Sequence, residues 1–264
     1  MKKVSFLLAA VGLAATSHAQ DGLVVCVDDV ATDVMYYLNG GWHSLFRPSD
    51  DPWGLAADNA TQTIYYNSGS ALYSWTAGGG EVFIGNINDG SANLTMVSLA
   101  YNPNDGFLYS TRNIANEGVY RIDPSTGAAT LENDYTDGDF DFGGLDIDPI
   151  TGIMYGANDD STPQRGLYKI GAGTPTFLTD YPAGETDLDG LAAYDNIVYL
   201  VSDEPGNFYM IDVNNLGAGY TAFANPWTTS EIFAGATVAA WLIPTPGTLG
   251  LLGLGLLAGT RRRR

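Results

Sequence analysis

The chain has 264 residues, of which 30 are acidic and 11 are basic, giving a net charge of −19. Six of the basic residues lie within the first three or the last four positions, so residues 20–243 keep 30 acidic side chains against five basic ones. A surface this acidic repels nucleic acid and anionic lipid, which excludes both as partners of the central segment, whereas cations and neutral glycans suit it.

The first 19 residues have the organisation of a secretory signal peptide. Two lysines precede an apolar stretch over 4–15, and small residues at positions 17 and 19 suit cleavage between Ala19 and Gln20. We therefore expect the chain to be exported across the inner membrane and residues 1–19 to be removed. A buried N-terminal helix is the alternative.

The chain contains one cysteine, Cys26, so it cannot form an internal disulfide. The exported domain must be stabilised by its core, for which about 220 residues are enough. We expect Cys26 to lie in a strand as a small buried side chain. Lipidation of Cys26 is the alternative, although Val25 is large for the preceding position and cleavage is already well placed after Ala19.

Four similar segments follow one another along the central part of the chain, beginning at Gly54, Ser98, Gly144 and Gly190. Each has a short apolar strand, a turn, an aromatic-ended strand, a polar loop, a strand containing tyrosine, another turn and a last strand. The tyrosines that close the second strand are Tyr65, Tyr109, Tyr155 and Tyr199. Four short strands per unit, at a period near 45 residues, are typical of the blades of a β-propeller. We expect the repeated tyrosines to pack in the core and between blades.

The two ends of this region complete the pattern. Residues 235–241 look like a fifth first strand, but only the C-terminal tail follows them, while strands at 23–29, 33–40 and 42–46 precede the first full repeat. We therefore predict an all-β fold, a five-bladed β-propeller in one domain over 20–243. One blade would combine a C-terminal strand with three N-terminal strands, which leaves no free sheet edge. A solenoid or a larger ring with a degenerate blade is the alternative.

Acidic residues gather in the connections that lead into the first strands. Asp137, Asp139 and Asp141 alternate before a glycine, like the beginning of a calcium-binding loop, although the bidentate glutamate of such a loop is replaced by Asp148. The matching connections hold Asp50, Asp51, Glu185, Asp187 and Asp189. Because these connections lie on one face of a propeller near its axis, we expect an acidic rim that binds Ca²⁺ and assists glycan binding. Solvated turn acids are the alternative.

Catalytic groups are scarce after the signal peptide. A Ser-His-Asp or Cys-His site would have to use His43, which we expect on an outer strand far from the centre of the ring. The histidine count excludes a histidine-rich zinc site, and no phosphate-binding loop or nucleophile elbow occurs. The many carboxylates leave a polysaccharide hydrolase or lyase open, but the sequence favours a protein without enzymatic activity.

The last 21 residues, 244–264, contain three parts in a fixed order. They are Pro244-Thr245-Pro246, an apolar glycine-rich stretch over 249–258, and the four arginines Arg261, Arg262, Arg263 and Arg264. Residues 247–260 would form a helix of about 21 Å, shorter than the ~30 Å hydrocarbon core of a bilayer. With residues 241–243 added it nearly spans the core, and the arginines would then stay on the cytoplasmic side.

This order of parts resembles the PEP-CTERM sorting signal of Gram-negative envelope proteins, which is also labelled an ice-binding-protein C-terminal domain. Thr245 replaces the glutamate of the family motif. The resemblance implies temporary retention in the membrane through the C-terminal helix and processing by an exosortase-like enzyme; a permanent single-pass anchor is the alternative. The repeats DIDPITGIMYGAND and VYRIDPSTGAATL resemble propeller repeats of exported bacterial proteins, which share no common activity.

We therefore expect a cell-envelope or extracellular-matrix protein that displays its propeller as a non-enzymatic binding or scaffold module. Exopolysaccharide is the partner that suits this expectation. A calcium-assisted carbohydrate-binding protein and a polysaccharide hydrolase or lyase are the alternative functions.

Overall fold

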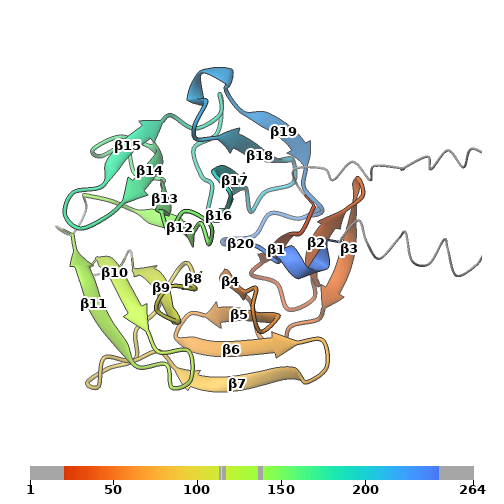
Figure 1. The fold of residues 1–264 in the computed structure, drawn as a ribbon, viewed down its shortest axis with the longest axis vertical. Helices are drawn as coiled ribbons and strands as arrows, with labels where there is room; N and C mark the ends of the chain where they lie inside the picture. Colours follow the sequence, from red (N-terminus) through yellow and green to blue (C-terminus); the bar gives the residue numbers. More distant parts are fainter. Residues whose placement is uncertain (1–20, 113, 115–116, 136–138, 244–264) are drawn as a thin grey trace, which may run out of the picture.

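Five four-stranded antiparallel sheets are arranged as blades around a central axis (Figure 1). The structure is a computed structural model that describes residues 21–112, 114, 117–135 and 139–243. The prediction of an all-β, five-bladed propeller is confirmed. The expected signal peptide (1–19) and C-terminal helix lie outside the described residues, and within those residues no helix has the length and apolar character needed to cross a bilayer.

Each blade runs from an inner strand at the axis to an outer strand at the periphery. In that order, blade 1 contains β20 (Ala234–Val238), β1 (Leu23–Val27), β2 (Val34–Leu38) and β3 (Gly41–Phe46). Blade 2 contains β4 (Gly54–Asp58), β5 (Thr63–Ser68), β6 (Ala71–Thr76) and β7 (Gly80–Asn86). Blade 3 contains β8 (Ala100–Asn102), β9 (Phe107–Arg112), β10 (Gly118–Ile122) and β11 (Ala129–Asp134). Blade 4 contains β12 (Phe142–Ile147), β13 (Met154–Asn158), β14 (Gly166–Ile170) and β15 (Thr176–Thr179). Blade 5 contains β16 (Gly190–Tyr194), β17 (Ile197–Val201), β18 (Asn207–Asp212) and β19 (Thr221–Ala224). Two 3-10 helices, η1 (Leu216–Ala218) and η2 (Ala240–Leu242), complete the described elements.

Blade 1 closes the ring as the sequence predicted. Strand β20 pairs antiparallel with β1 from Leu23↔Val238 to Val27↔Ala234, so the C-terminal strand becomes the inner strand of an otherwise N-terminal blade. This pairing joins the two ends of the domain by a ladder of backbone hydrogen bonds, and it removes the sheet edges that an open chain of blades would expose.

Glycines mark the places where the inner strands approach one another at the axis. A Cβ on Gly54 would lie 2.5 Å from the backbone nitrogen of Leu99, and a Cβ on Gly144 would lie 2.7 Å from the carbonyl oxygen of Asp189. Gly235 meets the next inner strand in the same way. At Gly54 and Gly144, each of which precedes a leucine in its repeat, only glycine fits between the converging backbones.

The space between blades is filled by apolar side chains from neighbouring sheets. The repeated tyrosines Tyr155 and Tyr199 are 2% and 3% exposed and belong to clusters shared by adjacent blades. Cys26 is buried in β1, as predicted. The core is thus a ring of interblade clusters and not one central cluster.

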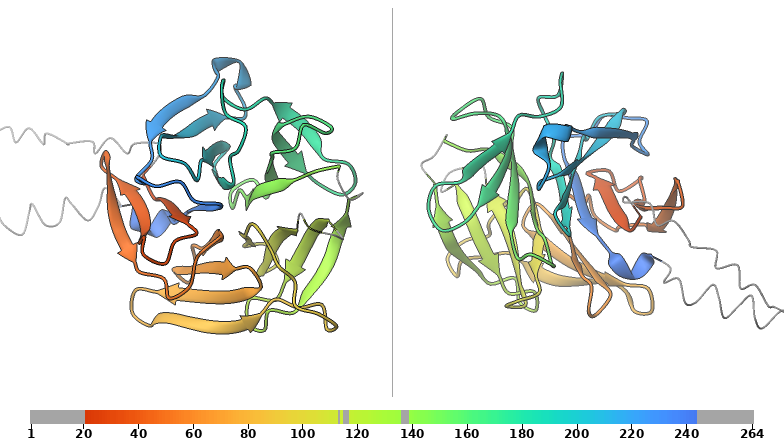
Figure 2. Two further views of the ribbon diagram at one scale, coloured as in Figure 1. Left: turned by 180° about the vertical axis from the view of Figure 1, so that it is seen from behind. Right: turned by 45° about the horizontal axis from the view of Figure 1, so that its top comes forward.

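The ring has two distinct faces, which the direction of the inner strands distinguishes. We call the face at which the inner strands begin and the second strands end the upper face, and the face at which the inner strands end the lower face. Figure 2 shows the ring from behind and tilted. Both ends of the described chain lie at the lower face, where the Ala239 N–H donates to the Gly22 carbonyl at 2.8 Å. The loops of the upper face therefore lie on the opposite side of the ring from both ends of the described chain.

Candidate functional site

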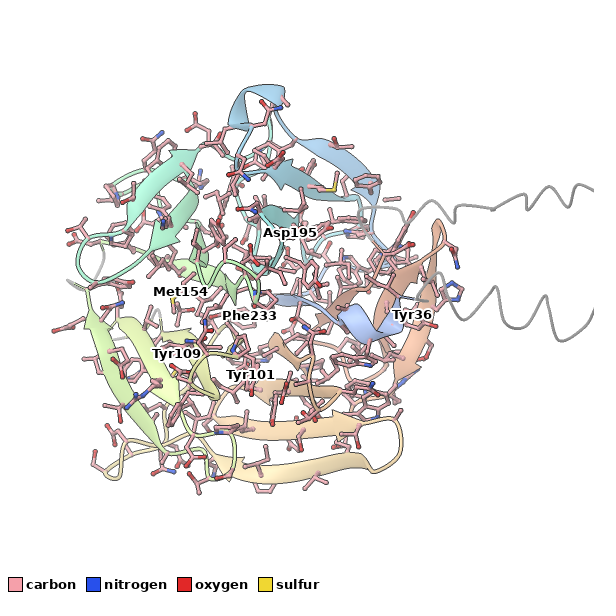
Figure 3. The ribbon with its side chains drawn as sticks, viewed as in Figure 1. Tyr36, Tyr101, Tyr109, Met154, Asp195 and Phe233 are labelled. Carbon is pink, nitrogen blue, oxygen red and sulfur yellow. The ribbon has the colours of Figure 1, made fainter. Side chains whose placement is uncertain are left out.

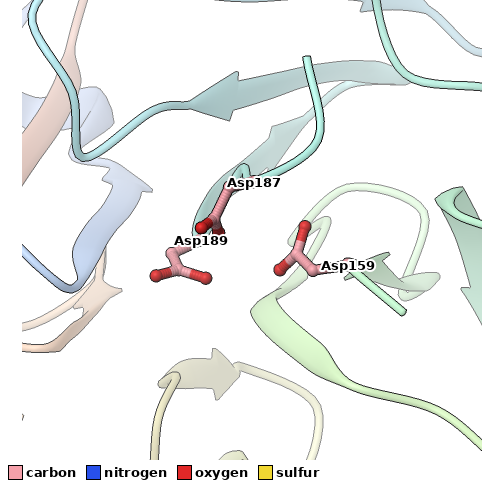
Figure 4. Close-up of side chains that lie close together, drawn as sticks. All are labelled: Asp159, Asp187 and Asp189. Atoms are coloured by element: carbon pink, nitrogen blue, oxygen red, sulfur yellow. The ribbon is translucent and has the colours of Figure 1, made fainter. Parts of the chain in front are cut away.

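Three carboxylates converge at the upper face, between blades 4 and 5. Asp159 directly follows β13, while Asp187 and Asp189 lie in the connection that enters β16 (Figure 4). Carboxylate oxygens from the three residues all lie within 4.8 Å of one another. The fold brings them together because the second strand of one blade ends where the inner strand of the next begins.

Hydrogen bonds fix the orientation of Asp159. Its Oδ1 accepts from the Tyr181 hydroxyl at 2.8 Å and from the Leu188 N–H at 3.1 Å, and the Arg165 Nε donates to its backbone carbonyl at 2.7 Å. These bonds use Oδ1 and the backbone. The second oxygen, Oδ2, is directed toward the space beside Asp189 and Gly143.

A fourth carboxylate, Asp203, adjoins the group. Asp203 lies two residues after the end of β17 and is 5% exposed. Its Oδ1 is buried and has no hydrogen-bond partner among the described residues. Its negative charge contributes to the raised pKa of Asp189, and the charges of Asp187, Glu204 and Asp28 contribute to the raised pKa of Asp203.

Burial and mutual repulsion raise the pKa of every member of this group. Burial is the main cause for Asp159 and Asp189, with added repulsion between these two and from Asp187. Burial also raises the pKa of Asp187, to which the charges of nearby acids add and which Arg165 partly offsets. Burial, followed by the charge of Asp187, raises the pKa of Asp203 to about 6. Carboxylates held this closely destabilise the folded chain unless a proton or a cation neutralises them.

A β-bulge in blade 4 lies directly beside this group of carboxylates. In blade 4 the pairing of β12 with β13 shifts from Phe142↔Asn158 to Gly144↔Ala157, which leaves Gly143 without an opposite residue. The pairings of the other four inner strands with their second strands show no such shift. A Cβ on Gly143 would overlap Asp189 Oδ1 and lie 2.7 Å from Asp159 Oδ2, so the two carboxylates approach each other over a residue without a side chain.

Only some of the acidic residues singled out from the sequence lie in or near this group of carboxylates. Asp187 and Asp189 join the group, and Asp141 lies near enough for its charge to raise the pKa of Asp159 and Asp187. Asp139 is exposed, and Asp137 lies outside the described residues.

The other predicted rim residues accept hydrogen bonds from residues outside this group. Asp50 accepts from the Tyr73 hydroxyl at 3.0 Å, Asp51 accepts from the Val30 N–H at 2.7 Å, and Glu185 accepts from the Tyr209 hydroxyl. These three acids serve as local loop and side-chain partners.

His43 is separated from this group, as the sequence predicted. It lies on β3, the outermost strand of blade 1, with its ring centroid 5.3 Å from that of Tyr36. Tyr36 is at the periphery of the ring, whereas Phe233 lies near its axis (Figure 3). The described residues therefore give the acidic group no histidine base.

Asp159 and Asp203 were not identified from the sequence, although a signal for them was present. Each stands four residues after the repeated tyrosine of its segment, Tyr155 or Tyr199. Because that tyrosine lies in the second strand of a blade, the position four residues later falls at the upper face. Alignment of the repeats against the predicted topology would have placed Asp159 beside the connection entering β16 and Asp203 beside the connection entering β20.

Comparison with solved structures supports the fold. No family model matches the sequence, and no curated protein matches it. A chain of a nidogen–laminin complex superposes with a TM-score of 0.53 at 14% identity, covering 83% of this chain and 86% of that one. A structural genomics protein of unknown function from Bacteroides thetaiotaomicron gives a TM-score of 0.53 at 13% identity, covering 83% of this chain and 65% of that one. TolB from Acinetobacter baumannii gives 0.50 at 13% identity, with 81% and 66% covered. At these identities the likeness concerns the propeller fold alone.

Proposed function

We propose that this chain is an exported protein of the cell envelope or extracellular matrix whose propeller is a non-enzymatic binding or scaffold module. The observation that carries the proposal is the convergence of Asp159, Asp187 and Asp189 from two blades at one face of the ring. A rigid, closed ring holds these groups in place with little cost in conformational entropy on binding, which suits recognition of a ligand.

Export and sorting rest on the two ends of the chain. The signal peptide directs residues 20–243 out of the cytoplasm, and the PEP-CTERM-like tail holds the C-terminus at the membrane until an exosortase-like enzyme processes it. The position of Ala239 and Gly22 at the lower face supports this arrangement, because the acidic group then faces away from the membrane.

The positions of His43 and Cys26 support a non-enzymatic role. His43 lies on an outer strand, and Cys26 is buried within blade 1, so neither reaches the described upper-face carboxylates. Glycoside hydrolysis needs only carboxylates, so it is the enzymatic alternative to this binding role. An assay for shortened polysaccharide chains tests it directly.

Calcium-assisted binding of carbohydrate is the second candidate function. The observation that favours it is a stacked aromatic pair at the same face, Trp53 and Phe233, with ring centroids 4.4 Å apart. Both residues directly precede inner strands and both remain partly exposed. An apolar ring face and a carboxylate-bound cation on the same face of the ring would suit the two sides of a sugar, its C–H face and its hydroxyls.

Fractionation and binding measurements test the proposed function. We expect the full chain, produced in a Gram-negative host, to begin at Gln20 and to be found in the envelope, and a chain ending at residue 243 to be released. Purified protein should sediment with exopolysaccharide, and Asp187→Asn should weaken this retention while Asp134→Asn leaves it unchanged. A cytoplasmic protein that retains Met1, or shortening of polysaccharide chains that Asp159→Asn abolishes, would contradict the proposal.

A further inference from the structure

We propose that β7, the outer strand of blade 2, is the surface through which two copies of this chain pair edge to edge. The two strands run antiparallel about a two-fold axis at Phe83, so that the sheet of blade 2 continues into the same sheet of the second copy. This inference goes beyond the proposed function, because it concerns the assembly of the chain and not the ligand of its upper face.

Strand β7 is the longest of the five outer strands, and its outer edge is open. It has seven residues, against six in β3 and in β11 and four in β15 and in β19. Among the described residues, the backbone of 80–85 hydrogen-bonds only within the sheet of blade 2, whereas the carbonyl of Ala224 in β19 accepts from Trp42 Nε1 at 3.0 Å. An open edge of this length is a template for pairing with another strand.

The side chains of β7 do not protect this edge. Edge strands are commonly kept apart by charged side chains or proline. In β7, Val82 is 56% exposed and Phe83 is 55% exposed, so apolar side chains project from both faces of the strand. Its one charged residue, Glu81, turns back into its own blade, where it accepts from the Tyr66 hydroxyl at 2.7 Å. The outer strand β11, by contrast, carries two exposed acids.

The low charge around β7 favours a second copy of this chain as the occupant. Residues 59–104 contain two acids, Glu81 and Asp89, and no base, although residues 20–243 contain 30 acids against five bases. Two copies of so acidic a chain repel one another when their acidic surfaces approach, and this repulsion is weakest at blade 2. A basic partner would be drawn to the acidic surfaces instead.

A two-fold axis at Phe83 makes β7 complementary to itself. Phe83 then lies opposite its own counterpart, and Val82 lies opposite Ile84 of the second copy. Glu81 lies opposite Gly85, so no carboxylate faces another. Residues directly opposite in an antiparallel pair have Cβ atoms about 4.5–5.5 Å apart, and apolar pairs at this distance stabilise the sheet.

The pairing also keeps the lower faces of both copies on one side. In Figure 1, β6 and β7 lie across the view at the periphery of the ring, while the axis of the ring points toward the viewer. A two-fold axis perpendicular to the sheet at β7 is therefore close to parallel with the axis of the ring. Since both ends of the described chain lie at the lower face, residue 243 of each copy is on the same side, as attachment of both copies to one membrane requires.

Sedimentation velocity of the purified full chain tests the proposal. We expect a monomer–dimer equilibrium with a Kd in the micromolar range. Phe83→Asp should weaken dimerisation at least tenfold, because it sets two carboxylates opposite each other across the two-fold axis. Leu131→Asp makes the same kind of change at an exposed position on β11 and should leave the Kd unchanged. Because both positions are exposed, the fold should remain intact, which circular dichroism can verify.

Cysteine cross-linking tests the register of the pair. Phe83→Cys should form a disulfide-linked dimer under mild oxidation, because opposite Cβ atoms lie close to the separation that a disulfide spans, and Cys26 is buried and does not compete. Leu131→Cys should remain monomeric. The proposal is overturned if the wild-type protein is a monomer at every concentration, if Phe83→Asp pairs as tightly as wild type, or if Phe83→Cys cross-links no more readily than Leu131→Cys. None of these outcomes bears on retention by exopolysaccharide, so the proposed function is judged separately.

Discussion

Replacing Asp203 by asparagine should make the protein more stable at neutral and higher pH. In the absence of a cation, ionised Asp203 is buried beside other acids, and its pKa is raised from 3.8 to about 6 by burial and then by the charge of Asp187. A neutral amide at this position removes the repulsion.

The structure gives the size of the effect. A rise of the pKa from 3.8 to about 6 corresponds to about 3 kcal/mol of lost stability once the carboxyl is ionised, at about 1.4 kcal/mol for each pH unit. The buried amide adds donors that need partners and so offsets part of this gain, leaving about 1–2 kcal/mol. For a domain of this size the net gain is a rise in Tm of about 3–6 °C.

The dependence on pH follows from the direction of the pKa shift. A carboxyl whose pKa is raised in the folded state contributes its full stability below the unfolded pKa, near 4, and loses that contribution as the pH rises to about 6. Wild type and Asp203→Asn should therefore differ in Tm at pH 8 in chelator and converge below about pH 4.

Thermal unfolding followed by circular dichroism in chelator, at pH 8 and below pH 4, measures both the gain in stability and its dependence on pH. Asp134→Asn serves as the charge-matched control. If Asp203→Asn lowers the Tm in chelator at pH 8, Asp203 stabilises the fold and the argument from repulsion is wrong.

Three other measurements test the account of the fold. Gly54→Ala should lower the free energy of unfolding by about 1–3 kcal/mol or more, because its Cβ would lie 2.5 Å from the backbone at the next inner strand. Gly171→Ala, whose Cβ meets open space, should change this free energy little. Equal denaturation midpoints for the two variants would contradict the close approach of the inner strands. Asp148→Asn should cost about 1–3 kcal/mol of stability at pH 7, because the carboxylate accepts two N–H groups of the turn after β16. Although burial raises the pKa of Asp148, its hydrogen bonds lower the pKa overall, so its stabilising contribution should disappear as the pH falls below about 4. A cost that is independent of pH would indicate a packing effect instead. Burial raises the pKa of the Cys26 thiol, so a thiol reagent should modify the native protein orders of magnitude more slowly than the denatured chain, and rapid labelling of native protein would show that β1 is accessible.

The acidic site could be predicted from the sequence only in part. Asp187 and Asp189 were found because they belong to a connection whose place in a propeller follows from the repeat. Asp159 stands in a different kind of connection, after a second strand, and was not compared with them. Gly143 is one of two adjacent glycines, and nothing in the sequence distinguishes an unpaired bulge residue from an extra strand residue. Asp50 and Glu185 were grouped with the site because they share its connections, yet each is hydrogen-bonded to a tyrosine of its own surroundings.

The sequence by itself determined the architecture. A period of about 45 residues with four strand patterns in each unit leaves few ways to bury every apolar face, and the single strand left at 234–238 could only complete the three at the N-terminus. The tertiary structure alone decided which carboxylates meet. Asp159 and Asp189 are 30 residues apart in the chain, and their side chains converge because blades 4 and 5 pack side by side around the axis, next to the bulge within blade 4. Local patterns specify strands and turns through short-range sterics and hydrogen bonds, whereas the distance between two loops depends on how whole sheets pack.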